Sequence, residues 1–270
     1  MIDPQALDTA LASCRNKWTV ECLDCVDSTN LELGRRFSGA GTVSHFLLWA
    51  EEQTEGRGRL QRRWLSIPGA DITVSVCFPA PVERTDIPKL SLCAGLALVS
   101  VVASRFGIEA QARWPNDVVT PKGKLAGILS SYLPTPNAVV CGIGINVNSQ
   151  PDSITLEEAR RRTTLLAELG REVAREALTG SWVAAFENLW PLAEVKRFRD
   201  LKTEFDSVSF YRDRKVRILK GAQARRDTAS GCEGFEGTAR SINTDGSLLV
   251  DLADGGTYEV SIEDVLIPLE

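Results

Sequence analysis

The chain has 270 residues, 43% of them hydrophobic and 25% charged, which suits one large globular domain or a large domain with a small one. Its formal net charge of −5 argues against general nucleic-acid binding, which requires a basic surface. No long apolar run predicts a membrane span, the N-terminus lacks a secretory signal, and the seven cysteines are an odd, scattered number that fits a reducing, cytoplasmic setting.

The first half of the chain predicts strands interspersed with helices. Residues 1–17 predict one short helix, so we expect no multi-helix DNA-binding domain before the rest of the fold. A strand is expected over residues 18–26, and Ser28 is a suitable N-cap for a helix whose Leu33 and Phe37 lie one turn apart. The further elements expected in this half are an apolar helix over 88–106 and strands over 46–51, 71–78, 109–114, 125–132 and 138–147. In the strand over 71–78 the apolar residues alternate, so one face is expected to hold Ile72, Val74, Val76 and Phe78.

The second half begins with helices and ends with strands. Helical segments are expected over 155–175, interrupted near Gly170, and a helix over 179–204 is bent or broken at Pro191. From about Ser207 the hydrophobic period becomes two, and about five short strands with Gly-rich turns predict a small barrel. The stretches that give these strands are 215–219, 234–242, 247–251 and 257–262. We therefore expect an α+β fold with two domains, residues 1–207 and residues 208–270.

Residues 54–69 predict a long loop between two strands, hereafter the glycine–arginine loop. Within it, residues 56–64 hold four arginines and two glycines. Glycine allows close approach of backbone to a ligand, and the arginine fork matches carboxylate and phosphate oxygens. The loop therefore suits a clamp that closes over an anionic small molecule. Taken alone, it would equally suit a solvated basic loop or an RNA-binding segment.

Five short blocks around this loop occur in an order that is typical of one enzyme family. They are Asp27-Ser28-Thr29-Asn30, Ala50-Glu51-Glu52-Gln53, Arg113-Trp114-Pro115-Asn116-Asp117, residues 123–129 and residues 142–148. With the loop, they resemble the biotin protein ligases, strongly over about residues 18–150 and weakly beyond. The resemblance implies the short class without an N-terminal DNA-binding domain. It also implies a class II synthetase-like catalytic domain, built on a mixed sheet flanked by helices, and a C-terminal SH3-like β-barrel.

The resemblance implies a two-step reaction. Biotin and ATP, both substrates, would give biotinyl-AMP, and the biotinyl group would pass to a specific lysine of a biotin carboxyl carrier protein. Mg²⁺ is expected with ATP, without a dedicated protein metal site. Neither DNA nor a membrane is an expected partner, and the chain could be a monomer or a homodimer.

The resemblance also assigns roles to individual residues. Lys124 would contact the biotin carboxylate and the α-phosphate, Arg59 would retain the intermediate, and Asp117 would orient Lys124 or take a proton from the acceptor lysine. These three form the expected catalytic set. The expected biotin-binding residues are Ser28, Thr29, Asn30, Gln53, Gly56, Arg57, Gly58, Arg59, Lys124, Gly127 and Gly142. Those expected to bind ATP or the adenylate are Arg57, Arg59, Arg62, Trp64, Asn116, Lys124 and Asn146.

Some features depart from the family pattern or have structural interpretations. The family usually has glycine at Gln61 and lysine at Arg113, so Gln61 would stiffen the loop. Cys22 and Cys25 have CxxC spacing, but in a strand they point to opposite faces and do not predict a metal site. His45 opens an apolar strand and is interpreted as structural.

Two other functions remain as alternatives. A lipoate or octanoate ligase shares the fold and the acyl chemistry, although the Arg-Arg-x-Ser-Gly-Gly-Gly block of those families is missing. A non-enzymatic RNA-binding module would use the arginines, but the acidic balance of the chain opposes it.

Overall fold

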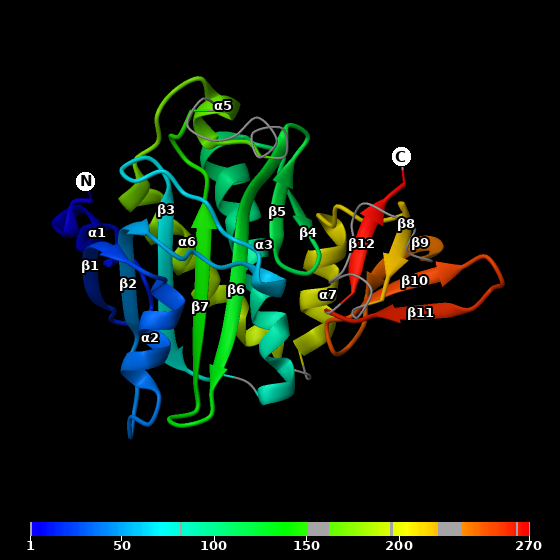
Figure 1. The fold of residues 1–270 in the computed structure, drawn as a ribbon, viewed down its shortest axis with the longest axis horizontal. Helices are drawn as coiled ribbons and strands as arrows, with labels where there is room; N and C mark the ends of the chain where they lie inside the picture. The colour runs from blue at the N-terminus through cyan, green and yellow to red at the C-terminus, as the bar shows by residue number, and fades with distance from the viewer. Residues whose placement is uncertain are drawn as a thin grey trace.

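A computed structural model describes residues 2–81, 83–150, 162–194, 197–220, 234–262 and 264–269. Its centre is a seven-stranded mixed sheet, in which β1 and β2 are parallel and the other neighbours antiparallel. From one edge to the other (Figure 1) the strands are β1 (Thr19–Val26), β2 (Phe46–Gln53), β3 (Ile72–Pro79), β7 (Ala138–Ile145), β6 (Gly123–Leu133), β5 (Asp117–Thr120) and β4 (Gln111–Arg113).

Helices cover both faces of this sheet because its strands alternate between two apolar faces. Leu47 and Trp49 of β2 point into the main core, whereas Leu48 between them packs in a smaller cluster under α2 (Thr29–Phe37). The opposite face carries α1 (Pro4–Leu11), α3 (Ile87–Phe106) and α6 (Arg175–Leu189), which pack on one another. Figure 1 shows α3 and α6 behind the sheet and α2 in front of it.

The long helix α3 is the central element of the main core. With the short turn before it, Arg84–Phe106 is long and apolar enough to cross a membrane by length and composition alone. In this fold 78% of its most apolar window is buried. Apolar residues all around a helix are expected when a sheet and other helices cover it.

The C-terminal region forms a second sheet, of five antiparallel strands. Their order is β11-β10-β9-β8-β12, with β8 (Lys215–Leu219), β9 (Phe235–Ile242), β10 (Leu248–Leu252), β11 (Thr257–Val260) and β12 (Val265–Pro268). Within the described ranges no pairing joins β11 to β12, so the sheet is open there and the predicted barrel closure is not seen. The number of strands agrees with the prediction, and β12 is the strand that the sequence pattern had not placed.

The helices between the two sheets differ in detail from the prediction. The helix expected over 179–204 begins earlier, as α6 at Arg175, and breaks at Pro191 into a short 3-10 turn and α7 (Phe198–Ser207). Proline cannot donate the next helical hydrogen bond, which explains the break. Of the segment expected over 155–175, α5 (Leu165–Leu169) ends at Gly170 as predicted, whereas residues 155–161 lie outside the described residues.

One turn of the second sheet is fastened to the first. Lys89 of α3 is fully buried, pairs with Asp86 at 2.6 Å and donates to the Thr244 carbonyl at 2.9 Å. The Trp114 indole N–H donates to the Gly246 carbonyl at 2.8 Å. Since Trp114 lies two residues before Asn116 and three before Asp117, the β9–β10 turn supports the segment that carries two predicted site residues.

Candidate active site

The floor of the site is a part of the central sheet that lacks large side chains. On the face that α2 partly covers, pairing places Ser75, Gly142 and Leu129 in one row. The next row along the strands holds Thr73, Gly144 and Gly127, and ends at Asp117. Because side chains of a strand alternate between faces, the two glycines of β7 leave bare backbone where neighbouring positions on this face would carry side chains.

A cavity of about 670 Å³ lies over this floor. It is lined by all the predicted site residues except Gly56 and Asn146: Ser28, Thr29, Asn30, Gln53, Arg57, Gly58, Arg59, Arg62, Trp64, Asn116, Asp117, Lys124, Gly127 and Gly142. The sequence therefore predicted residues that the fold brings together, although their contacts with ligands are still predictions.

One end of the cavity is a network of neutral hydrogen-bonding groups. The Thr29 amide donates to Gln53 Oε1 at 2.9 Å, and the Thr29 hydroxyl lies 2.6 Å from that of Ser75. Ser75 donates to Asn30 Oδ1 at 2.7 Å, and Asn30 Nδ2 donates to the Leu129 carbonyl at 2.8 Å. These bonds orient both amides: the Gln53 oxygen is occupied by Thr29, and its NH₂ group, which donates to no described residue, points to a role in ligand binding.

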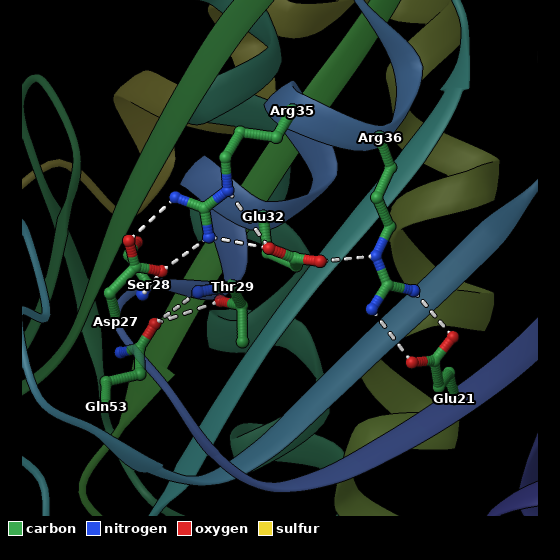
Figure 2. Close-up of polar contacts among 8 residues, drawn as sticks. All are labelled: Glu21, Asp27, Ser28, Thr29, Glu32, Arg35, Arg36 and Gln53. Carbon is green, nitrogen blue, oxygen red and sulfur yellow. Dashed lines mark hydrogen bonds and ion pairs between the residues drawn. The ribbon is translucent and has the colours of Figure 1, made fainter.

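The start of α2 is fixed from outside by a charged network. Figure 2 shows Arg35 with both Nη atoms on the Asp27 carboxylate, at 2.7 and 2.8 Å, while Asp27 Oδ1 accepts from the Ser28 amide at 2.7 Å. The hydrogen bond from Arg35 lowers the pKa of Asp27 to about 2. Ser28 is the N-cap by position, as predicted, but its side chain makes no capping bond. Asp27 thus holds the turn that brings Ser28 and Thr29 to the cavity.

The glycine–arginine loop folds over the cavity as a small hairpin. Trp64 N donates to the Gly56 carbonyl at 2.8 Å, and Gly58 N donates to the Arg62 carbonyl at 2.7 Å. In Figure 1 this loop crosses the face of the sheet that α2 also covers, in front of β7 and β6. Gly56 does not line the cavity, but a Cβ there would lie 2.6 Å from the Trp64 carbonyl oxygen, so the hairpin itself requires glycine.

Trp64 lies on the bare backbone of the floor. A Cβ on Gly144 would overlap the Trp64 indole, and one on Gly127 would lie 3.0 Å from its ring. The Lys124 ammonium lies over the same ring, 5.3 Å from its centroid. The indole nitrogen is buried without a hydrogen-bond partner among the described residues, which is costly and suggests a surface that a ligand would complete.

The other end of the cavity is cationic. Lys124 Nζ is 2.6 Å from Asp117 Oδ1, and Arg113 is 2.7 Å from Asp117 Oδ2. Burial would raise the pKa of Asp117, but the two cations outweigh it and hold that pKa below its usual value. Asp117 is therefore a carboxylate that fixes the position of Lys124, as one of its two predicted roles requires.

Arg59 extends this cationic end from the loop. Its Nη1 donates to Asn116 Oδ1 at 3.2 Å, while Nη2 is buried with no partner in the described ranges. Burial lowers the pKa of Arg59, although a guanidinium remains protonated at neutral pH. Asn116 donates to the Ile128 carbonyl at 2.7 Å, so its amide oxygen faces Arg59. A half-buried cation with a buried donor that has no partner in the described ranges is suited to an anionic ligand.

Asn146 lies beneath the cavity rather than in its wall. It is 2% exposed and its Nδ2 donates to the Lys124 carbonyl at 2.9 Å. This contact supports the backbone of Lys124 directly. The predicted contact of Asn146 with the nucleotide remains a prediction.

The sequence reasoning missed several residues of the wall. Ser75 was missed, although the apolar face predicted for its strand leaves it on the opposite face, where the cavity lies. Nothing in the sequence pattern predicted the C-terminal contribution, which consists of Phe210, Tyr211, Asp264, Val265, Leu266 and Pro268. The buried Tyr211 has its pKa raised to about 12, mainly by burial.

The remaining residues considered in the sequence are the two cysteines with CxxC spacing and His45. Cys22 and Cys25 are free thiols, and no cluster of three or more His, Cys, Asp or Glu in the described part of the chain could hold a metal ion. His45 packs against Trp18, Phe78 and Trp190, and burial lowers its pKa. This packing agrees with the structural interpretation of His45.

Comparison with known proteins defines the class. The sequence profile of the Biotin/lipoate A/B protein ligase family matches residues 22–148, the stretch that builds most of the cavity. The structure of the biotin protein ligase from Aquifex aeolicus in complex with biotin and ATP superimposes with a TM-score of 0.75 and 25% identity, over 93% of this chain and 99% of that one.

Within the biotin/lipoate ligases, the relatives found by sequence similarity include biotin ligases. The biotin–[acetyl-CoA-carboxylase] ligase of Mycobacterium tuberculosis (strain ATCC 25618 / H37Rv) is 31% identical over 98% of this chain and 95% of its own length. The bifunctional ligase/repressor BirA of Bacillus subtilis (strain 168) is 29% identical over 90% of this chain and 72% of its own length. The chain belongs to the biotin protein ligase family.

Proposed function

We propose that this chain activates biotin with ATP as biotinyl-AMP and transfers the biotinyl group to a lysine of a biotin carboxyl carrier protein. The observation that carries the proposal is a single cavity with two chemically different ends. Neutral amides and hydroxyls at one end suit the uncharged ureido ring of biotin, and cations at the other suit a carboxylate and a triphosphate.

The first step joins two anions, so its main need is positive charge held in position. Lys124 supplies a compact charge at the cationic end, where the biotin carboxylate would attack the α-phosphate and release pyrophosphate. Arg59 and Arg57 of the loop would bind the phosphate oxygens, with Mg²⁺ arriving as part of MgATP. Trp64 and the loop would then exclude water from the mixed anhydride.

The second step transfers the biotinyl group from AMP to the acceptor lysine. That lysine must lose a proton to attack the acyl carbon, and AMP leaves. A carboxylate with a lowered pKa is a weak base, so we assign Asp117 to orienting Lys124 rather than to proton removal. We further propose the domain boundary between residues 207 and 208 and a cytoplasmic location, which the scattered free cysteines support.

The test is intact-mass analysis of a biotin carboxyl carrier domain incubated with the chain, ATP and Mg²⁺. With biotin we expect one biotinyl adduct, abolished when the acceptor lysine is replaced by arginine. An adduct with lipoate but none with biotin would instead identify a lipoate ligase. If neither acid gives an adduct and the chain binds RNA, the proposed enzyme function is wrong.

A further inference from the structure

A buried carboxylate outside the cavity joins three segments of the site. Asp71, immediately before β3, has a side chain only 1% exposed and accepts four hydrogen bonds. Its Oδ1 accepts from the Val147 amide at 2.9 Å and the Ser149 hydroxyl at 2.7 Å. Its Oδ2 accepts from the Ile67 amide at 3.0 Å and from Arg162, whose Nη2 is 2.9 Å away.

The four donors come from three different segments of the site. Ile67 lies where the glycine–arginine loop returns to the sheet, and its carbonyl also accepts from the amides of Ala70 and Asp71. Ser149 follows the glycine-containing strand β7, and its hydroxyl accepts from Arg162 at 2.7 Å. Asp71 therefore fixes the exit of the loop against the end of the cavity floor.

The same contact reaches the strand of Lys124. The backbone at Arg162 forms a parallel bridge with Lys124, and the Thr163 amide donates to the Lys124 carbonyl at 2.9 Å. A Cβ on Gly123 would lie 2.9 Å from the Arg162 carbonyl carbon, so the two backbones are in close contact. Arg162 thus bridges Asp71 to the residue that we propose as the main catalytic cation.

We propose that Asp71 is a positioning residue that keeps the glycine–arginine loop in register with Lys124, so that the closed loop retains biotinyl-AMP. The inference rests on the proposed function, because it concerns the intermediate of that reaction. Asp71 touches no substrate in this arrangement and acts through Ile67 and Arg162. Its loss should loosen the loop and release the intermediate while the charged groups that activate biotin remain in the cavity.

Asp71→Asn removes only some of the hydrogen bonds that the Asp71 carboxylate accepts. The oxygen retained by asparagine can still accept from Val147 and Ser149, while the amide in place of Oδ2 cannot accept from Ile67 or Arg162. A matched control exists on the other face of the sheet. Glu187 of α6 is 1% exposed and accepts from Arg15, Asn16 and the Trp18 indole, so Glu187→Gln also perturbs a buried, hydrogen-bonded carboxylate.

The experiment compares the parent, Asp71→Asn and Glu187→Gln for thermal stability, biotin-dependent pyrophosphate release and escape of biotinyl-AMP into solution. Hydrogen exchange of the Gly58 and Trp64 amides reports on the loop without any turnover. We expect both variants to lose stability. Only Asp71→Asn should speed escape of the intermediate, by about tenfold, the usual factor for one lost hydrogen bond to a charged group. It should also speed loop exchange, and its first pyrophosphate burst should stay close to that of the parent.

Equal escape from the parent and from a folded Asp71→Asn would overturn the inference, as would equal escape from both variants. If Asp71→Asn does not fold, Arg162→Met removes the side-chain contact from Arg162 to Asp71 while leaving the carboxylate and the backbone bridge to Lys124, and the same comparison decides. A parent without biotin-dependent pyrophosphate release would refute the proposed function. The exchange measurement would then still decide whether Asp71 orders the loop.

Discussion

Replacement of Gln61 by glycine tests whether the hairpin of the glycine–arginine loop is held against backbone strain. Leu60 and Gln61 have φ values of 54° and 60°, in the left-handed region that glycine occupies without penalty. A non-glycine residue there costs about 1–2 kcal/mol. Glycine also gains freedom in the open loop, which offsets part of this, so we expect Gln61→Gly to favour the hairpin by about 0.5–1 kcal/mol.

That free energy corresponds to an about two- to fivefold shift in the equilibrium between hairpin and open loop. Hydrogen exchange of the Gly58 and Trp64 amides, which donate to Arg62 and Gly56 across the hairpin, should slow by this factor. If the hairpin is the closed lid, escape of biotinyl-AMP should slow equally. Asp213→Gly is the control, because Asp213 has a φ of 59° outside the loop and should leave loop exchange unchanged.

Exchange of these two amides that is unchanged or faster in Gln61→Gly would refute the reasoning. In that case the strain at Leu60 and Gln61 would not limit the hairpin. Slower exchange with unchanged escape of the intermediate would separate the two claims, since it would confirm the strain and show that the hairpin is not the retaining lid.

Three further predictions concern the floor, the core and the charged network. Gly142→Ala places a methyl group against the Asn30 amide, and we expect it to raise the KM for biotin at least about tenfold. The control is Gly34→Ala, which has open space around the new methyl group and should leave this KM unchanged. Equal KM values in the two variants would contradict the role of Gly142. Glu187→Leu removes the acceptor of the Trp18 indole N–H and of the Arg15 and Asn16 amides. We expect it to lower the free energy of unfolding, measured by urea denaturation, by about 3 kcal/mol. A loss below about 1 kcal/mol would show that these three groups find other partners. Arg35→Met should move the pKa of Asp27 from about 2 toward 3.8 in an NMR titration, because the hydrogen bond from Arg35 is the main cause of the lowered pKa. The stability that the lowered pKa gives is complete above 3.8 and is lost as the pH falls to about 2, and an unchanged pKa in the variant would assign the shift to another group.

The sequence predicted which face of β3 enters the core because strand alternation is a local property. The prediction that Ile72, Val74, Val76 and Phe78 share one face was correct: all four are buried in the main core. It follows that Ser75 lies on the opposite face, toward the cavity. The blocks that carry the resemblance, together with the loop, contain most of the residues that line the cavity. They could be predicted because a short motif specifies both a residue type and its position near the end of a strand.

Contacts between distant segments could not be predicted in the same way. Nothing local in Lys89 indicates that its ammonium bonds to Thr244, and a lysine in an apolar helix is more often placed at its surface. The hairpin inside the loop was also unpredicted, because two non-glycine residues with positive φ contradict the local preference. The Asp71 contacts likewise depend on Arg162, far along the chain, and become visible only in the fold.

The measurement that tests the account most directly is biotin-dependent pyrophosphate release by Lys124→Ala beside Lys122→Ala. The Lys122 side chain is 56% exposed and bonds to the Ala167 carbonyl, outside the cavity lining, whereas Lys124 pairs with Asp117 within it. We predict a loss of about 10²–10³-fold for Lys124→Ala, as for other contacts that strengthen in a transition state. Lys122→Ala should stay within about twofold of the parent, as an exposed substitution does. A folded Lys124→Ala that releases pyrophosphate at a near-normal rate, or an equal loss in both variants, would contradict the claim that this cavity activates biotin.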